Sequence, residues 1–287
     1  MIQETCRKLQ FPEEAISCLS HCYQKILTTD HALDLLYQAM DPFFLEDTSS
    51  YEQFLDKVSH MTGIHRYSVD MVFLLLSSKS MRYLYHEKGY TEEFYWANLS
   101  DLKNKLMECK MLHNIWGTRS CGWFRGIYTC VLFLIGRLQF EMRTLPVDDY
   151  KGIAKRGDAA IKVHIPSCGP LLQEDAIRSF ELAKEFFKEY FVGKPTGFYC
   201  GTWLLYPRHY HEVYTPGSNL CKFYELFDIV DSSESPDNHD FWRVFYQSFR
   251  EEEIDSLLEN TSLQRNFKKY LKAGNLMGIG MGIRILE

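Results

Sequence analysis

The sequence lacks a surplus of positive charge. Its 287 residues include 32 lysines and arginines against 38 aspartates and glutamates, which gives a formal net charge of −6. Proteins that bind nucleic acid neutralise phosphates with dense basic patches, and no basic run of that density occurs here. The charge balance therefore predicts that the protein does not bind nucleic acid.

Long apolar segments are also missing. The longest purely apolar run near the middle of the chain, Met71 to Leu76, is far shorter than the roughly 20 residues with which a helix crosses a bilayer. The first residues, MIQETCRKLQFPEE, contain no apolar core of the kind that a secretory signal requires. We therefore expect a cytoplasmic protein with no membrane segment.

The nine cysteines include no Cys-x-x-Cys pair, and Cys18 and Cys22 lie one helical turn apart, which is not the spacing of a structural zinc site. Without a secretory signal, we expect reduced and mostly buried thiols. His209, His211 and Glu212 invite a metal interpretation, but no third ligand follows at a useful spacing. A polar loop is the better interpretation, and the sequence predicts no metal site.

Apolar and aromatic residues are abundant. Hydrophobic residues make up 46% of the chain and aromatic residues 15%, which is enough for a packed core. Extensive disorder is therefore excluded. The length fits one large domain or two of ordinary size.

Residues 1 to about 115 repeat apolar side chains every three or four positions, which predicts a series of amphipathic helices. Asp30 and Ser68 are placed to cap two of these helices, and Pro42 and Gly89 to end two. None of the helices gathers catalytic residue types. We interpret the segment as a helical domain that covers one flank of the protein.

The character of the sequence changes near Trp116 and Gly117. In residues 136–143, apolar and polar side chains alternate as in a half-buried strand. Residues 162–187 read as a second strand, a turn that contains Gly169, and an amphipathic helix. A strand that leads into a helix through such a turn presents unpaired backbone N–H groups, which favour an anion.

The later elements complete the order strand, strand, strand, helix, strand, helix, strand, strand. We predict strands at 197–207, 228–231 and 241–247, helices at 220–226, 251–258 and 262–272, and a final glycine-rich strand. The chain should thus contain a helical domain over residues 1–117 and a mixed α/β domain over residues 118–287.

This order of elements resembles that of the GNAT superfamily of acyl-CoA-dependent N-acyltransferases. Three parts carry the likeness: GRLQFEM followed by VHIPSCGPL, then TWLLYP, then SNLCKFYELF. Over nearly its whole length the chain resembles a family of bacterial two-domain proteins with a helical N-terminal domain and a GNAT-like C-terminal domain. The resemblance implies an α+β fold, in which a mixed, mostly antiparallel sheet is flanked by helices.

The resemblance also implies a reaction. Acetyl-CoA or another acyl-CoA would be the donor, a small-molecule amine the acceptor, and the transfer direct, with no metal and no covalent enzyme intermediate. In GNAT enzymes the turn after the central strand binds the CoA pyrophosphate through backbone amides. Here that turn begins at Ile165, and its donors would be Ser167, Cys168 and Gly169. A homodimer is compatible with the sequence, which does not decide the oligomeric state.

A second signature of many GNAT enzymes is an Asn followed five residues later by a Tyr, and Asn219 and Tyr224 have that spacing. By resemblance, Asn219 would contact the cofactor and Tyr224 would protonate the leaving thiolate. Core packing is an equally good interpretation of Tyr224. The base would be His164 or Glu141 on the polar faces of neighbouring strands, although purely structural roles are more frequent for such residues.

Three functions stay open at this point. The first is the N-acyltransferase. The second is a catalytically silent protein of the same fold that binds a small metabolite or a protein partner, because the turn departs from the usual Gln/Arg-x-x-Gly-x-Gly/Ala signature. Pro170 removes an amide donor, and Glu174 and Asp175 place negative charge where a pyrophosphate would bind. The third is a thiol-dependent hydrolase that uses Cys168 and His164.

Overall fold

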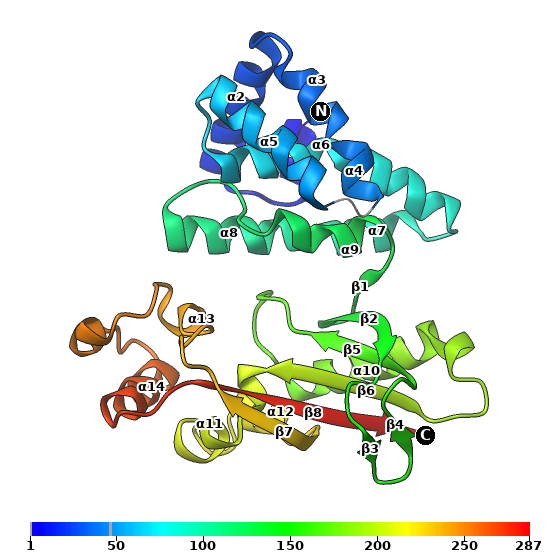
Figure 1. Cartoon of the computed structure of the whole chain (residues 1–287), viewed down its shortest axis with the longest axis vertical. Helices are drawn as coiled ribbons and strands as arrows, with labels where there is room; N and C mark the ends of the chain where they lie inside the picture. The colour runs from blue at the N-terminus through cyan, green and yellow to red at the C-terminus, as the bar shows by residue number, and fades with distance from the viewer. Residues whose placement is uncertain (1, 46–47) are drawn as a thin grey trace. The chain divides into compact units, whose positions relative to one another are not determined.

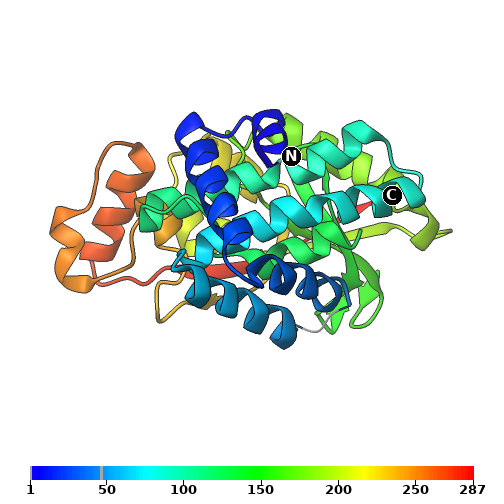
Figure 2. The same cartoon turned by 90° about the horizontal axis from the view of Figure 1, so that it is seen from above.

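The computed structural model describes residues 2–45 and 48–287, and the chain divides into two compact units, Met1–Phe133 and Leu134–Glu287 (Figures 1 and 2). The first unit is helical, and the second contains a sheet with helices, as the sequence predicted. The boundary at residues 117 and 118 stays a prediction about where independently folding domains meet.

The first unit is formed by helices of very different length. Their bounds are α1 (Ile2–Lys8), α2 (Glu13–Thr28), α3 (Ala32–Gln38), α4 (Met40–Phe44), α5 (Thr48–Thr62), α6 (Arg66–Glu87), α7 (Glu92–Leu99), α8 (Asp101–His113), the 3-10 turn η1 (Cys121–Trp123) and α9 (Phe124–Tyr128).

Helix α6 is the core of this unit. Its residues 68–78 are all buried, because α6 contacts α1, α2, α5, α7, α8 and α9 on its different sides. A helix that is apolar all round belongs in a core of this kind. In the described part of the chain, no helix is long and apolar enough to cross a membrane.

Three predicted helix boundaries were wrong. Helix α3 follows His31, and no side chain caps it, so Asp30 is not its cap. Helix α6 begins earlier than predicted, because the ring of His65 accepts a backbone hydrogen bond at its start, and Ser68 lies inside the helix. Pro42 lies in the first turn of α4, where its missing N–H costs nothing. It therefore does not end a helix.

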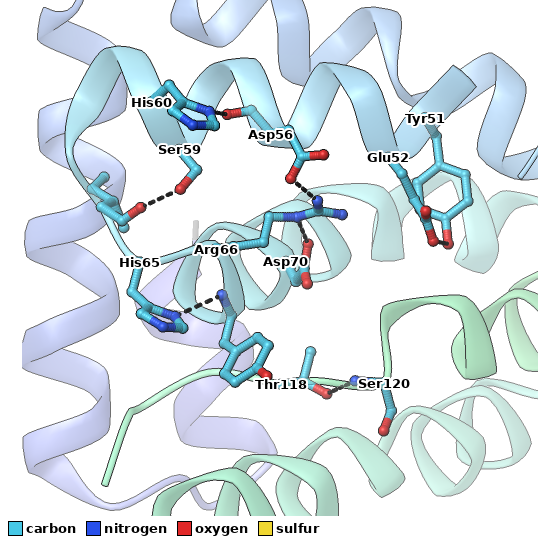
Figure 3. A network of polar contacts seen from close by, with 12 residues as sticks. Tyr51, Glu52, Asp56, Ser59, His60, His65, Arg66, Asp70, Thr118 and Ser120 are labelled. Carbon is cyan, nitrogen blue, oxygen red and sulfur yellow. Dashed lines mark hydrogen bonds and ion pairs between the residues drawn. The ribbon is translucent and has the colours of Figure 1, made fainter. Parts of the chain in front are cut away.

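A polar network connects α5 with α6 (Figure 3). Arg66 donates through Nε to Oδ1 of Asp70 at 2.6 Å and pairs through Nη1 with Asp56. Asp70 is only 5% exposed. Burial raises the pKa of Asp70 to about 7, although the neighbouring Arg66 acts in the opposite direction.

The second unit is organised by a six-stranded sheet with the strand order β1-β2-β5-β6-β8-β7 (Figure 1). Strands β5 and β6 are parallel, whereas the pairs β2–β5, β6–β8 and β7–β8 are antiparallel. The bounds are β1 (Leu132–Ile135), β2 (Leu138–Thr144), β5 (Ala159–His164), β6 (Thr196–Thr202), β7 (Asp228–Glu234) and β8 (Gly278–Leu286), with β3 (Asp149–Tyr150) and β4 (Ala154–Lys155) as a separate small hairpin.

One face of the sheet is apolar and packs on α10 (Gln173–Phe186), which also contacts α12 (Asn219–Tyr224). The ring of Phe180 in α10 makes edge contacts with Phe140, Phe198 and Phe227 at centroid distances of 5.0 to 5.9 Å. Such ring clusters bury large apolar areas. They fix α10, and with it the turn that precedes α10, against the middle of the sheet.

The opposite face is the polar face, which we define by Glu141, Lys162, His164 and Tyr199. The strand register places these residues together, because Glu141 lies opposite Lys162, and Lys162 lies beside Tyr199. The β3–β4 hairpin covers one end of this face, where Tyr150 packs in a cluster with Tyr199. The other end, at His164, leads into the turn before α10.

Smaller helical elements complete this unit. They are η2 (Lys188–Tyr190), η3 (Trp203–Leu205), α11 (Pro207–Glu212), α13 (Trp242–Phe245), η4 (Glu251–Ser256) and α14 (Ser262–Lys272). The predicted bounds of α14 are confirmed at both ends, and Thr261 and Gln264 form a capping box at its start.

Two strand predictions in this unit need correction. The strand predicted at 197–207 ends at Thr202, whose hydroxyl accepts a hydrogen bond from the amide of Leu204 and begins η3. The segment 241–247 is helical in α13 instead of extended. Phe241, Val244 and Phe245 are buried there at helical spacing, and a short apolar run does not distinguish the two periods.

Candidate active site

The centre of the polar face is a hydrogen-bonded pair. His164 Nε2 lies 2.8 Å from Glu141 Oε1, and the two side chains are 17% and 8% exposed. Glu141 lies opposite Lys162, and His164 lies opposite Gln139, so Glu141 and His164 are diagonal neighbours on one face of an antiparallel pair. The sequence indicates each of them as an alternative base, and the structure brings the two side chains together.

Positive charge surrounds the Glu141 carboxylate. Arg143 Nη2 lies 2.6 Å from Oε2, and Lys162 Nζ lies 3.7 Å from Oε1. Burial raises the pKa of Glu141, but the hydrogen bond to His164 and the charges of His164, Arg143 and Lys162 outweigh it, so that the net pKa is below its ordinary value. Glu141 is therefore a carboxylate at neutral pH.

This geometry sets the tautomer of His164. A carboxylate only accepts hydrogen bonds, so Nε2 carries the proton that Glu141 accepts, and the lone pair of the neutral ring is on Nδ1. A carboxylate that holds an imidazole in one tautomer is an arrangement that serves proton transfer.

Arg143 and Tyr199 lie at this site but were not among the residues predicted from the sequence. Arg143 follows Glu141 by two positions in one strand, so the alternation of the strand was a sufficient signal. Tyr199 is 8% exposed, and burial, followed by the charge of Glu141, raises its pKa. Its position beside Lys162 depends on the β5–β6 register, for which the sequence contains no local signal.

The parallel strands β5 and β6 are paired over a short distance. The register joins Ile161 to Phe198 and Lys162 to Tyr199, whereas β5 continues to His164 and β6 to Thr202. Strands that separate in this way leave backbone N–H and C=O groups at their carboxyl ends. An extended ligand with amide groups can bind to such an edge.

The turn between β5 and α10 is exposed at the three residues predicted to bind the pyrophosphate. Ser167, Cys168 and Gly169 are all exposed, and Gly169 has φ of +104°, which glycine adopts without strain. The N-cap residue of α10 is Leu172, which makes no side-chain cap. The first-turn amides of α10 thus lack an internal acceptor, which suits an anion.

Helix α12 lies next to the start of α10. The Gln173 side chain donates to the carbonyl of Lys222 at 3.2 Å, which ties the two helices together. Tyr224 is half-buried and stacks on Tyr210 with ring centroids 4.2 Å apart. Burial raises the pKa of Tyr224, so its hydroxyl is protonated at neutral pH, and Asn219 is exposed at the first position of α12.

The side chains of α11 that invited a metal interpretation make contacts within the protein fold. His209 is fully buried, and its Nδ1 donates to the carbonyl of Trp203 at 2.8 Å. Burial lowers the pKa of His209 to about 4. Glu212 accepts a hydrogen bond from Arg208 at 2.8 Å. Among residues 2–45 and 48–287, no group of three or more His, Cys, Asp or Glu side chains is arranged to hold a metal ion.

All nine cysteines are free thiols, and six of them are buried, which confirms the expectation of mostly buried thiols. Burial raises the pKa values of Cys6 and Cys22 to about 12, so these two are unreactive at neutral pH. Cys168 is the exposed member of the set. A thiol-dependent hydrolase would pair Cys168 with His164, but the Nε2 atom of His164 is hydrogen-bonded to Glu141.

Comparison with known families decides the assignment. Residues 132–284 match the model of the GNAT-like C-terminal domain, and residues 1–130 match the model of the N-acyltransferase N-terminal domain. The chain belongs to the GNAT-like C-terminal domain family. As a family member with this N-terminal domain, it is a two-domain N-acyltransferase, which the resemblance implied.

The fold of this family member is shared with solved acyltransferases. A structure of an acyltransferase in complex with decanoyl-CoA and teicoplanin has 20% sequence identity and a TM-score of 0.76, over 99% of this chain and 87% of that chain. A mutant acyltransferase in complex with octanoyl-CoA gives the same values. Another acyltransferase structure with decanoyl-CoA has 19% identity and a TM-score of 0.66, over 100% and 99% of the two chains.

At this level of identity the likeness shows a common fold. The predicted α+β class, with helices first and a mixed, mostly antiparallel sheet second, is thereby confirmed. No curated protein sequence matches the chain.

Proposed function

We propose that this N-acyltransferase takes its acyl group from an acyl-CoA and transfers it to an amine of a small molecule. The observation that carries the proposal is the Glu141–His164 pair on the polar face, with a hydrogen bond of 2.8 Å. An amine is an ammonium ion at neutral pH and has to lose a proton before its nitrogen attacks. A histidine held by a carboxylate is suited to accept that proton.

The donor binds along the carboxyl ends of β5 and β6. The turn from Ile165, with the amides of Ser167, Cys168 and Gly169, and the first turn of α10 bind the pyrophosphate. Asn219 contacts the cofactor from α12. The exposure of this turn and the separation of β5 from β6 support the placement.

The acyl transfer proceeds in one direct displacement. The amine nitrogen gives a proton to His164 and attacks the thioester carbonyl, so that a C–N bond forms. The C–S bond breaks, and the departing sulfur takes a proton from the hydroxyl of Tyr224. The nitrogen loses its second proton to solvent as the amide forms, the Tyr224 phenolate takes a proton back from solvent, and His164 releases the proton that it accepted. The products are an amide and free CoA.

The acyl group that we propose is of medium length. Acyltransferases of the same fold have been solved with octanoyl-CoA and decanoyl-CoA, and one of them with teicoplanin. These ligands support an octanoyl or decanoyl donor ahead of acetyl-CoA for this chain. The acceptor is proposed only as an amine-bearing small molecule.

Calorimetric titration of the full chain with octanoyl-CoA, acetyl-CoA and CoA tests the donor. We expect micromolar binding, tightest for octanoyl-CoA, followed by amine-dependent release of free thiol in a screen of amines. His164→Gln should slow the release about 10²-fold and keep the binding, whereas His239→Gln, at an exposed loop position, should alter neither. Absence of wild-type binding at millimolar acyl-CoA would favour a silent protein that binds another metabolite.

A further inference from the structure

One guanidinium group holds the turn before α10. Arg137 donates from Nη1 to the carbonyl of Pro166 at 2.9 Å, from Nη2 to that of Gly169 at 2.8 Å, and from Nε to that of Pro170 at 2.9 Å. Three of the five N–H donors of the side chain thus bind one short segment of backbone. Hydrogen bonds from a charged donor are about twice as strong as neutral ones.

Arg137 is itself fixed to α10. Its backbone N–H donates to Ser179 Oγ at 2.7 Å, and the Ser179 hydroxyl donates to the carbonyl of Asp175 at 2.7 Å. The preceding residue, Gly136, has φ of +68°, and a Cβ there would lie 2.5 Å from Ser179 Oγ. The start of β2, the turn and the first part of α10 are therefore joined through one residue.

The three hydrogen bonds also decide which way the turn faces. In a trans peptide the C=O and the following N–H point in opposite directions, and the chain contains no cis peptide bond in its described part. Because the carbonyls of Pro166 and Pro170 point at Arg137, the amides of Ser167 and Leu171 point away from it. Within the described residues, neither amide has a hydrogen-bond acceptor.

We propose that Arg137 is a positioning residue for the donor: it holds the turn in the shape that presents backbone amides to the CoA pyrophosphate. This inference rests on the proposed use of acyl-CoA. The turn lacks the usual glycine-rich signature, and the guanidinium supplies from outside the constraint that the signature supplies from within. Its positive charge also offsets the nearby charges of Glu174 and Asp175. Arg137 therefore controls affinity for the pyrophosphate and leaves the acyl-transfer step unchanged.

Two donors separate this role from general stabilisation. Octanoyl-CoA carries the pyrophosphate, and octanoyl-pantetheine lacks it. With Arg137→Ala we expect KM for octanoyl-CoA to rise about tenfold or more, kcat to stay within about twofold, and KM for octanoyl-pantetheine to stay within about twofold, since one or two lost charged hydrogen bonds correspond to at least about a tenfold change. Arg137→Lys should give an intermediate rise, because an ammonium cannot replace the three-way fork.

A matched control tests for the loss of positive charge alone, and a second variant covers the case in which Arg137→Ala does not fold. Arg178→Ala removes an exposed positive charge from α10 and should leave both KM values unchanged. Ser179→Ala keeps the guanidinium but removes the bond to the Arg137 backbone, and should show the same donor selectivity at a smaller size if Arg137→Ala does not fold.

The outcomes for the two proposals differ. Suppose that the wild type binds octanoyl-CoA. If the Arg137 variants then raise the KM values for octanoyl-CoA and octanoyl-pantetheine equally, or raise neither value, Arg137 is not a positioning residue for the pyrophosphate. If the wild type itself neither binds nor uses octanoyl-CoA, the proposed donor is wrong, and the role of Arg137 falls with it.

Discussion

At the residue scale, the hydrogen bond between Glu141 and His164 makes the two side chains one functional unit. We expect His164→Gln and Glu141→Gln each to lower kcat/KM by about 10²-fold, the lower end of the range for a general base. The kcat/KM of the double variant should be no lower than that of the less active single variant, because the effects of groups that act as one unit are not additive. A double-mutant cycle measured on the same amine checks this, and fully additive losses would show two independent roles.

Tyr224 allows a second test at this scale. Tyr224→Phe keeps the ring that stacks on Tyr210 and removes the hydroxyl, so we expect kcat to fall by about 10²-fold with donor affinity unchanged. Tyr210→Phe removes only a hydrogen bond to exposed Glu225 and should keep activity within about twofold. Full turnover by Tyr224→Phe would assign the residue to packing.

At the scale of elements, the glycines of β8 permit the close approach of η3. A Cβ on Gly280 would lie 1.8 Å from the carbonyl oxygen of Leu205, whereas a Cβ on Gly201 in the neighbouring strand would only touch Met281 at 3.9 Å. We expect Gly280→Ala to lower the free energy of unfolding by about 2–3 kcal/mol through overpacking. Gly201→Ala, the matched control, should be nearly neutral in urea unfolding.

The same scale shows what the sequence could predict. Helix α14 was predictable, because its capping box at Thr261 is local. The alternation around Glu141 and His164 placed each on a polar strand face, but their pairing depends on a register between strands about 20 residues apart. Arg137 was missed for the same reason, since it binds a turn far along the chain. The aromatic run from Phe241 was misassigned, because three buried residues in so short a segment fit a helix or a strand.

At the scale of the whole molecule, the two units contain buried groups with opposite responses to pH. His209 in the second unit has its pKa lowered from 6.5 to about 4. Its contribution to stability is complete above pH 6.5 and is lost as the pH falls to 4, because the unfolded chain then binds more protons. The loss amounts to about 3 kcal/mol, since each tenfold change in proton affinity corresponds to about 1.4 kcal/mol.

Asp70 in the first unit acts in the other direction. Its pKa rises from 3.8 to about 7, so its contribution is complete below pH 3.8 and is lost as the pH rises to 7. Urea unfolding at pH 5 and pH 7, followed by hydrogen exchange of each unit, should show that mild acid destabilises the second unit relative to the first. His209→Gln should remove most of this difference, and identical pH responses of the two units would contradict the assignment.

The distribution of the cysteines has a practical consequence. Cys168, the exposed one, lies in the turn that we assign to the donor, while the buried thiols of Cys6 and Cys22 are protected by their raised pKa values. An alkylating reagent added to the unmodified chain should therefore react first at this turn. A bound donor should cover the turn and slow the labelling of Cys168. The labelling rate therefore reports donor occupancy, and acyl-CoA analogues can be ranked by it before any acceptor amine is known.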